Sequence, residues 1–412
     1  MKAGYSALIM LGLIQTGCNL FEKLNTRIEP SRPSVVESAP LQPVVALDGV
    51  LTALQDGRIL ITGGLLWDPK YVSQANLGTR SQYSQIYDPV SKKFSAPMLM
   101  KQERYQHQAV LLPDGRVLVA GGSCDSCFSN ASPQNPRIAK AEIFDPATGS
   151  WSWAGEMVHP RENFSLLVLD GRAVAIGGMI WGDVVDPLDP SGYLSSIEIY
   201  DPTTDRWQVS SARLPEGVHT PIVVALDSQR VLIAGGFAED PTGVGSREIA
   251  LSGIFTINAT AERYKSGARM QVPRALASGI LLSNGHVLVV GGSSLGAHLD
   301  SAEIYDPSNE RWRQIQHRLP QPRSGAALIV LRGQVTLLGG DTGSATLLAG
   351  FSPLDEVLSY DEVSESWLIS GSRLASPRAF PRALPVLSGQ SAFVFGGLSY
   401  PGVSSLNLFE IH

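Results

Sequence analysis

One short segment recurs seven times along this chain and limits the folds available to it. In its clearest form, Leu111 to Gly122, it reads LLPDGRVLVAGG: an apolar run, an Asp-Gly turn, a second apolar run and a glycine pair. The second glycines of the copies are spaced almost evenly and stand at Gly64, Gly122, Gly178, Gly236, Gly292, Gly340 and Gly397. A sustained period of about 50 residues indicates a repeat architecture, so we expect one array rather than two or three separate domains.

The composition agrees with an array of short strands. The chain holds 43% hydrophobic residues, 41 Gly and 27 Pro, and only 17% of its residues are charged. Such values are typical of many strands joined by tight turns, and they predict an all-β fold. The net charge is -6 and there is no basic run, which argues against a nucleic-acid partner because phosphate binding needs a clustered positive face.

Each repeat contains the sequence of four strands. In the second repeat, HQAVLL and RVLVA are two strand-length apolar runs separated by Asp114-Gly115, a strong hairpin signal. A longer connection follows the glycine pair, and AEIF and SWSW then flank a second tight turn that contains Asp145 and Gly149. We call these strands a, b, c and d. Four antiparallel strands with a face that one repeat cannot bury alone predict the blade of a β-propeller.

Aromatic residues on strands c and d have a fixed spacing of seven positions in five repeats. The pairs are Tyr87 and Phe94, Phe144 and Trp151, Tyr200 and Trp207, Tyr305 and Trp312, and Tyr360 and Trp367. We interpret them as packing between neighbouring blades rather than as a ligand site. The fourth repeat has Phe255 but Glu262 seven positions later, so its outer strand is the least regular. The glycine pair and these aromatics resemble the kelch repeat, and the resemblance implies a seven-bladed propeller of four-stranded blades over residues 35–412.

The seventh repeat lacks a strand d, because the sequence ends at His412, the last residue of the strand c segment LNLFEIH. In five repeats the strand d aromatic lies at a nearly constant distance before the next glycine pair, as Phe94 does before Gly122. The same step back from Gly64 leads to Val36. We therefore expect Ser34 to Ser38 to form strand d of the last blade. That strand would close the ring and protect its exposed edges.

Residues 1–18 have the pattern of a bacterial export signal. Lys2 precedes the apolar run YSALIMLGLI, and Gly17-Cys18 follows. The segment resembles a lipoprotein signal, which implies lipidation of Cys18, although Gln15 departs from the usual pattern and an ordinary secretory signal is the alternative. No aspartate follows Cys18, which favours the outer membrane or the periplasm of a bacterial cell envelope. Residues 19–34 are polar and are expected to form a tether.

The two ends of the predicted propeller differ in the length of their connections. The a-to-b and c-to-d turns are short and share one face, whereas the b-to-c and d-to-a connections are longer and share the other. Long loops on a rigid scaffold usually carry binding residues. Aromatics in them either form contact patches or cover the core of the propeller; they include Trp67, Tyr71, Tyr83, Phe128, Trp181, Tyr193 and Phe237.

An arginine recurs at a nearly constant distance before the second glycine in five repeats. These residues are Arg104, Arg161, Arg274, Arg323 and Arg378. If they converge at the mouth of the central channel, their guanidinium groups would suit a carboxylated or sulfated ligand. The alternative is structural, with the arginines paired to recurring acids such as Glu142, Glu198 and Glu303.

Other chemistry is sparse in the sequence. Cys124 and Cys127 form a C-x-x-C segment that could close a small disulfide loop in an oxidising compartment or remain as inert thiols. A zinc site would need further ligands at suitable spacing, and none is present, so we expect no metal and no cofactor.

Two classes of function remain. The first is a monomeric, non-catalytic module that binds a protein, peptide or glycan through the long loops and reaches the membrane through Cys18. The second is a sugar-modifying enzyme, because kelch-like propellers resemble sialic-acid mutarotases and, with less support here, oxidases of the galactose oxidase type. We cannot map the copper ligands of such an oxidase onto this sequence. The binding module is the preferred interpretation.

Overall fold

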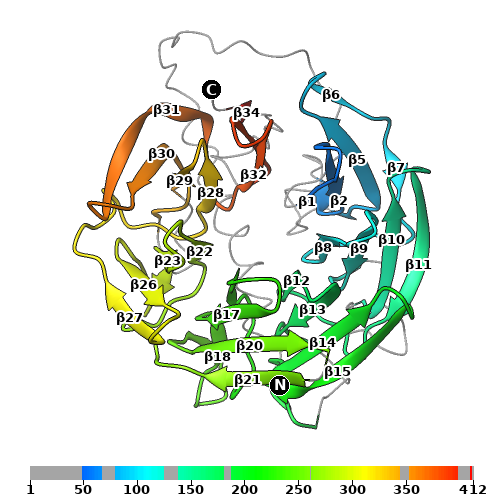
Figure 1. Cartoon of the computed structure of the whole chain (residues 1–412), viewed down its shortest axis with the longest axis horizontal. Coiled ribbons are helices and arrows are strands. Elements are labelled where there is room, and N and C mark those ends of the chain that lie inside the picture. The colour runs from blue at the N-terminus through cyan, green and yellow to red at the C-terminus, as the bar shows by residue number, and fades with distance from the viewer. Residues whose placement is uncertain are drawn as a thin grey trace, which may run out of the picture.

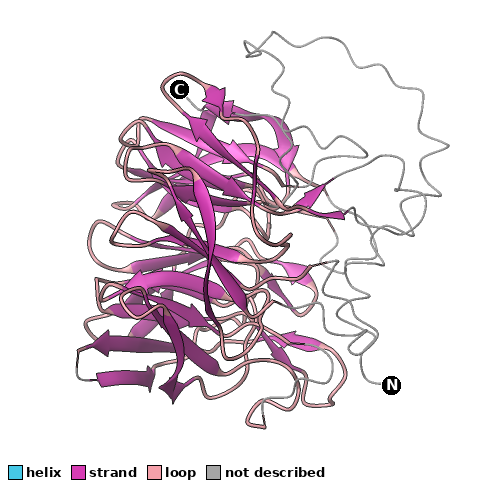
Figure 2. Cartoon of the chain, turned by 90° about the vertical axis from the view of Figure 1, so that its right-hand side faces the viewer, coloured by secondary structure: helices cyan, strands magenta, loops and turns pink. Residues whose placement is uncertain are grey.

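A computed structural model describes residues 49–66, 79–124, 138–180, 187–259, 261–343, 352–397 and 409–410. Every element assigned in these ranges is a β-strand, and no helix among them is long and apolar enough to cross a membrane. The sheets are arranged radially around a central axis (Figure 1), as in a β-propeller. Seen from the side, the described strands form a disc (Figure 2).

The first three sheets follow the predicted order of strands. Blade 1 has the order β1-β2-β5-β6, and β7 also pairs with β5. Its strands are β1 (Val50–Ala53), β2 (Ile59–Thr62), β5 (Tyr83–Asp88), β6 (Lys93–Phe94) and β7 (Met98–Leu99). Blade 2 consists of β8 (Gln108–Leu111), β9 (Val117–Ala120), β10 (Lys140–Asp145) and β11 (Ser150–Glu156). Blade 3 consists of β12 (Ser165–Leu169), β13 (Arg172–Ile176), β14 (Ser196–Asp201) and β15 (Arg206–Arg213).

The next three sheets repeat this antiparallel pattern. Blade 4 consists of β16 (Ile222–Ala225), β17 (Arg230–Ala234), β20 (Ser252–Asn258) and β21 (Ala261–Ser266). Blade 5 consists of β22 (Ser278–Leu281), β23 (Val287–Val290), β26 (Ala302–Asp306) and β27 (Arg311–Gln314). Blade 6 consists of β28 (Ala327–Leu331), β29 (Gln334–Leu338), β30 (Leu354–Asp361) and β31 (Ser366–Arg378).

The last sheet has three strands in the described residues: β32 (Arg382–Val386), β33 (Ser391–Phe395) and β34 (Phe409–Glu410). Within the described residues the structure therefore has six complete blades, one of which includes the short additional strand β7, instead of the seven that the sequence predicts. Within the described ranges the seventh repeat supplies strands a, b and c, and no fourth strand pairs with β34. Ser34 to Ser38, which we expect to complete this sheet, lie outside the described residues.

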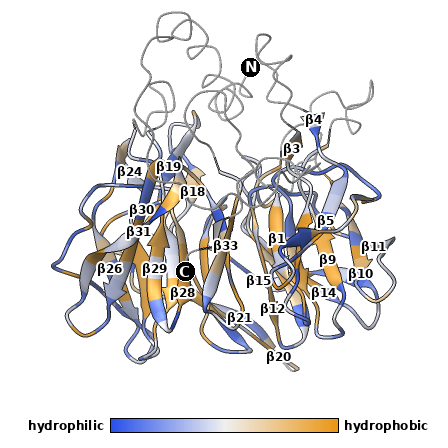
Figure 3. Cartoon of the chain, turned by 90° about the horizontal axis from the view of Figure 1, so that it is seen from above, coloured by the Kyte–Doolittle hydropathy of each residue, from blue (hydrophilic) through white to orange (hydrophobic). Residues whose placement is uncertain are grey.

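Short hairpins extend the b-to-c connections on one face of the disc, which we call the loop face. They pair β3 (Leu65–Leu66) with β4 (Thr79–Arg80), β18 (Phe237–Glu239) with β19 (Ser246–Glu248), and β24 (Ser293–Ser294) with β25 (Ala297–His298). Figure 3 shows labelled strands of all three hairpins at the same end of the molecule. The opposite end, which we call the turn face, carries the a-to-b and c-to-d turns.

The core lies between the sheets rather than in one central mass. Seven clusters of buried apolar side chains each join one sheet to the next, for example Leu118 of blade 2 with Ala173 of blade 3. One cluster joins the last sheet to blade 1, where the rings of Tyr87 and Phe393 lie 4.6 Å apart. Strands such as β9 and β29 are accordingly hydrophobic in Figure 3. Packing therefore continues around the whole ring and stabilises each sheet through its neighbours.

The predicted aromatic pairs are confirmed as neighbours across strands c and d. Tyr200 and Trp207 face each other in the ladder with ring centroids 5.3 Å apart, and both belong to the cluster between blades 2 and 3. In blade 4 the partner of Phe255 is Tyr264, nine positions later instead of seven. Its outer strand is therefore regular, but the hairpin that connects it is two residues longer than the sequence pattern indicates.

Candidate functional site

The five recurring arginines lie at the start of their repeats and are almost fully buried. Arg104, Arg161 and Arg274 are 0% exposed, and Arg323 and Arg378 are 1% exposed. Each guanidinium donates a hydrogen bond to the carbonyl of the first glycine in its own repeat, for example from Nη1 of Arg161 to the oxygen of Gly177 at 2.7 Å. The side chains thus run into the sheets, beside the ends of strands b.

Four of the arginines form buried ion pairs with a glutamate on strand c. The nitrogen–oxygen distances are 2.8 Å for Arg104–Glu142, 2.5 Å for Arg161–Glu198, 2.8 Å for Arg274–Glu303 and 2.5 Å for Arg323–Glu356. Glu356 is four positions before the strand c aromatic instead of two, and a bulge in β30 still brings it to its arginine.

The glutamates also accept hydrogen bonds from the d-to-a connection that leads from the preceding blade. Glu198 accepts hydrogen bonds from the backbone N–H groups of Val158 and His159, at 2.7 and 2.9 Å. Burial by itself would raise the pKa of Glu198, but the Arg161 charge, His159 and these N–H groups lower it to about 2. The carboxylate is therefore ionised and held between two blades.

The arginine backbone completes this link. The carbonyl of Arg161 accepts a hydrogen bond from the N–H of Gly122, the second glycine of blade 2, at 2.8 Å. The same bond joins Gly64 to Arg104, Gly236 to Arg274, Gly292 to Arg323 and Gly340 to Arg378. Gly121, the first glycine of that pair, has a φ of +67°, and an added Cβ would lie 2.5 Å from the same carbonyl of Arg161. Close approach between blades therefore requires glycine there.

This burial argues against a ring of ligand-binding arginines at the channel mouth and supports the alternative that they are structural. Their guanidinium groups are enclosed by the protein, and four of them are neutralised by carboxylates. Burial lowers the pKa of Arg378 to about 10, and its Nη1 donates to the carbonyl of Gly396. A ligand on the loop face would have to contact other side chains.

Blade 4 lacks both members of the ion pair. Val218 stands where five other repeats have arginine, and its carbonyl accepts the hydrogen bond from Gly178 at 2.8 Å. Gly253 stands two positions before Phe255, where Glu198 precedes Tyr200, and a Cβ there would lie 2.3 Å from the Tyr264 hydroxyl oxygen. Pro215, three positions before Val218, has no N–H to donate. Tyr264 therefore fills the place of the glutamate side chain. Blade 4 has neither the guanidinium nor the proline-position N–H that would need such an acceptor.

A second repeated feature lies at the loop face and was not singled out in the sequence. The residue after each second glycine forms an isolated antiparallel bridge with the residue after the arginine position. We call these five pairs the mouth residues: Tyr105–Ser123, Glu162–Met179, His219–Phe237, Ala275–Ser293 and Ser324–Asp341. Their backbone arrangement is constant while their side chains differ from blade to blade. Alignment of the repeats on their glycine pairs would have identified these positions.

An aromatic stack covers the seam between blades 3 and 4 on this face. The His219 ring lies 5.3 Å from that of Tyr193 and 5.1 Å from that of Phe237, and both contacts are stacked. Both ring nitrogens of His219 are buried without a hydrogen-bond partner in the described residues. Burial lowers the pKa of His219 to about 4, so the imidazole is neutral near pH 7. Tyr193 is 7% exposed, so this part of the predicted aromatic surface covers the core.

Polar groups gather next to this stack, across blades 4 to 6. The Ser293 hydroxyl donates to Oε1 of Glu248 at 3.2 Å, and Nε2 of His298 lies 3.6 Å from Oδ2 of Asp341. Asp341 is fixed by the backbone N–H groups of Gly343 and Ser352, which donate to its Oδ1. The mouth thus presents an aromatic sector beside a polar sector, a combination that suits a ligand with both kinds of surface.

The remaining predicted residues are divided between described and undescribed parts of the chain. Tyr83 begins β5, and Cys124 is buried and disulfide-bonded. Cys18, Cys127, Trp67, Tyr71, Phe128 and Trp181 lie outside the described residues. Among the described residues, no group of three or more His, Cys, Asp or Glu side chains is arranged to hold a metal ion.

Comparison with known proteins places these observations in context. The Kelch motif family model matches residues 160–211 and 276–317. The chain is 25% identical to Kelch-like protein 40 of Mus musculus over 285 residues, which cover 68% of this chain and 42% of that protein. It is 29% identical to Beta-scruin of Limulus polyphemus over 215 residues, or 51% of this chain and 22% of that protein. The matches thus span less than half the length of these two relatives.

Two further similarities extend over more of the chain. Kelch-like protein terF of Aspergillus terreus is 23% identical over 352 residues, which cover 80% of this chain and 68% of that protein. The solved structure of YjhT aligns with a TM-score of 0.55 at 14% identity and covers 81% of this chain and 99% of that one. At this identity the likeness concerns the fold alone. Together with the repeated glycine pairs and aromatic pairs, these comparisons support a kelch-repeat protein with a β-propeller fold.

Proposed function

We propose that this protein is an exported, non-catalytic binding module whose loop face recognises a protein, peptide or glycan. One observation carries the proposal: the mouth residues keep the same backbone bridge in five repeats but carry different side chains. Constant backbone gives a rigid frame, and varied side chains give a surface specific for one ligand. The ion pairs beneath the mouth support it because they fix the blades on which these residues stand.

The sector around blades 3 and 4 is the proposed centre of the contact. Phe237 is half-buried and stacks on His219, which in turn stacks on the buried Tyr193, and the β18–β19 hairpin continues from Phe237. Aromatic residues supply much of the energy of interfaces because they bury a large area and lose little conformational entropy. The nearby Glu248–Ser293 pair supplies polar contacts at the edge.

A binding screen with matched variants tests this proposal. The full chain is assayed against a glycan array and a panel of purified envelope proteins, followed by titration of each ligand found. We expect Phe237→Ala to weaken binding at least tenfold, whereas Trp153→Ala should not, because Trp153 is 46% exposed on the outer strand β11 of blade 2. Equal binding by both variants and the wild type would show that the loop face is not the site.

We further propose that residues 1–18 direct the chain to the cell envelope, with Cys18 as a lipid anchor and residues 19–34 as a tether. The pattern of Lys2, the apolar run and Gly17-Cys18 supports this location. Metabolic labelling with a fatty acid should modify the wild type and leave Cys18→Ser unlabelled. Label retained by the variant would exclude acylation at this position.

We also propose that Ser34 to Ser38 complete the last sheet as a seventh blade. The described part of that sheet ends with β34 paired to β33, and its cluster with blade 1 already closes the ring by packing. A fourth strand would protect the outer edge of β34. Deletion of residues 33–40 should lower the unfolding midpoint sharply, and an unchanged midpoint would exclude this closure.

A further inference from the structure

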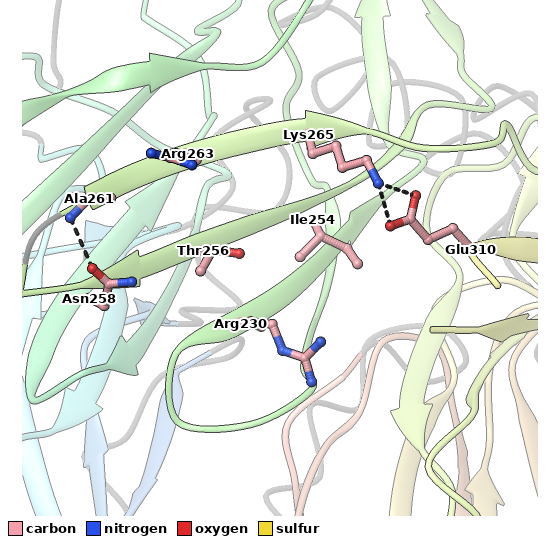
Figure 4. Close-up of a pocket in the computed structure, with 8 residues that line it drawn as sticks. All are labelled: Arg230, Ile254, Thr256, Asn258, Ala261, Arg263, Lys265 and Glu310. Atoms are coloured by element: carbon pink, nitrogen blue, oxygen red, sulfur yellow. Dashed lines mark hydrogen bonds and ion pairs between the residues drawn. The ribbon is translucent and has the colours of Figure 1, made fainter. Parts of the chain in front are cut away.

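A hollow of about 470 Å³ lies on the turn face, between blade 4 and blade 5, at the end of the sheets opposite to the mouth residues. Figure 4 shows its lining, which comes from the start of β17, from β20 and β21, and from the c-to-d turn of blade 5. We call it the basic hollow and define it by Arg230, Thr256, Arg263, Lys265 and Glu310.

The hollow exists because the c-to-d hairpin of blade 4 is longer than the others. Phe255 pairs with Tyr264 nine positions later, so β20 continues to Asn258 and β21 begins at Ala261. Thr256 and Arg263 face each other in this ladder, and Arg230 of β17 is paired with Thr256 from the other side. Because paired residues on antiparallel strands point to the same face, these three side chains share the side that lines the hollow.

The charge of the hollow differs from that of the equivalent position in the other blades. In five other blades the strand c aromatic is followed by an aspartate whose side chain accepts backbone hydrogen bonds in the turn; these residues are Asp88, Asp145, Asp201, Asp306 and Asp361. Blade 4 has Thr256 instead. In blade 5 the aspartate also lies 3.8 Å from His286, the residue equivalent to Arg230. Blade 4 therefore lacks the strand c carboxylate that would lie between Arg230 and Arg263.

The cations are only partly neutralised by other groups. Lys265 donates to both carboxylate oxygens of Glu310, at 2.6 and 2.8 Å. Nε of Arg230 donates to Asp227 at 2.6 Å, and its two terminal nitrogens have no partner among the described residues. Arg263 has no ion-pair or hydrogen-bond partner for its side chain in the same part of the chain. The hollow thus carries three cations against two carboxylates, with free guanidinium donors on two strands.

We propose that the basic hollow binds an oxyanion, namely a phosphate or sulfate group, free or carried as a monoester by a small molecule such as a sugar. Guanidinium groups bind such anions with paired hydrogen bonds, and the Thr256 hydroxyl adds a neutral donor between Arg230 and Arg263. The ion pair of Lys265 with Glu310 borders the site on the side toward blade 5. This site is separate from the loop face, so it stands whether or not the proposed function is correct.

The test is isothermal titration of the full chain with sodium phosphate, sodium sulfate and a hexose 6-phosphate at constant ionic strength, with sodium chloride and the unphosphorylated hexose as controls. We expect saturable binding of the oxyanions. Arg263→Gln should weaken it at least tenfold, and Thr256→Asp, which restores the aspartate of the other blades, should abolish it. The matched control is Arg206→Gln, because Arg206 faces Asp201 in the blade 3 ladder and should leave binding unchanged.

The outcomes separate the possible sources of the anion. Tighter binding of the hexose phosphate than of inorganic phosphate would assign the site to a monoester, and equal binding would assign it to the free anion; both support the proposal. No saturable binding, or binding that Arg263→Gln and Arg206→Gln weaken equally, would overturn it. Unfolding midpoints within error of the wild type must accompany each variant, and they are expected because Arg206 and Arg263 are exposed.

Discussion

In blade 3 a buried arginine and a buried glutamate, Arg161 and Glu198, occupy the positions that Val218 and Gly253 occupy in blade 4. Both solutions keep the backbone hydrogen bond to the glycine pair of the preceding blade, Gly122 to Arg161 and Gly178 to Val218. The link between blades is therefore a property of the backbone, and the ion pair is one of two ways to support it.

The difference between the two blades shows what the ion pair requires. In blade 3, Glu198 is surrounded by donors from Arg161, Val158 and His159. In blade 4, Pro215 removes a donor, Val218 removes the cation, and Tyr264 occupies the space next to Gly253. A buried charged pair is stable only when both of its members are present, and in blade 4 the cation and the carboxylate are both absent. Blade 4 also carries the two features that break the repeat, the aromatic stack and the basic hollow.

The largest expected effect comes from breaking the pair in blade 3. Glu198→Ala leaves Arg161 buried without its counter-charge and leaves two backbone N–H groups without their acceptor, so it should cost about 3–5 kcal/mol of the free energy of unfolding. Urea denaturation measures this cost. The control is Glu365→Ala, which removes the half-exposed pair with Arg313 and should cost less than about 1 kcal/mol. Equal costs would show that burial does not govern these pairs.

As the pH falls, the aromatic stack between blades 3 and 4 should lose its contribution to stability before the ion pair of blade 3 does. The folded-state pKa of His219 is about 4 against an ordinary value of 6.5, so the unfolded chain binds more protons between these values. Stability is therefore highest above pH 6.5 and falls as the pH drops toward 4, by at most about 3 kcal/mol from this residue. His219→Phe should lose this part of the pH dependence in urea titrations at pH 4 to 7. An unchanged slope would mean that His219 does not titrate as its burial indicates.

The contribution of Glu198 has a different pH range. Its pKa is lowered from 4.5 to about 2, so its stabilisation is present above pH 4.5 and is lost as the pH falls through 2. His219→Phe and Glu198→Ala should therefore remove different parts of the pH dependence, one between pH 6.5 and 4 and the other between pH 4.5 and 2.

Transplanting the blade 4 pattern into blade 3 tests whether the pair acts as a unit. The double variant R161V/E198G should lose less free energy of unfolding than the two single variants, Arg161→Val and Glu198→Gly, lose together. We expect a coupling energy of about 2 kcal/mol. The four proteins of this cycle are compared by urea denaturation at pH 7. Additive costs would indicate that the two residues stabilise the blade independently.

The smallest expected effect concerns the space that replaces the glutamate in blade 4. Gly253→Ala places a Cβ 2.3 Å from the Tyr264 hydroxyl oxygen, 2.4 Å from its Cζ and 2.6 Å from the carbonyl oxygen of Lys265, and should cost about 1–2 kcal/mol of the free energy of unfolding through overpacking. Tyr264→Ala in the same protein removes the ring, so Gly253→Ala should cost less in that background than in the wild type, and thermal unfolding measures both costs. With equal costs, the strain would have to arise elsewhere in the β20–β21 hairpin.

The strands, their order in each blade and the aromatic pairs could be predicted because they depend on local patterns. Asp114-Gly115 specifies a tight turn, and the apolar runs on either side specify β8 and β9. The burial of Arg161 could be offered only as one of two alternatives. Its distance along the chain from Gly178 is fixed by the repeat, but its direction depends on Glu198 and on the carbonyl of Gly177, which are brought near it only by folding.

The mouth residues and the basic hollow were missed for different reasons. The mouth residues directly follow the second glycines and the arginine positions, so an alignment of the repeats would have identified these positions from the sequence. The hollow results from a two-residue extension of one hairpin and from Glu310 of the next blade, and neighbouring blades meet only in the assembled ring.

The sequence by itself determined the repeat, the hairpins and the propeller class, because glycine pairs, turn residues and alternating apolar runs act over a few residues. Only the tertiary structure decided that six sheets are complete four-stranded blades in the described residues, that the arginines are internal, and that blade 4 carries an exposed cationic hollow. These properties depend on which side chains share the space between adjacent sheets, and that space exists only when the ring has formed.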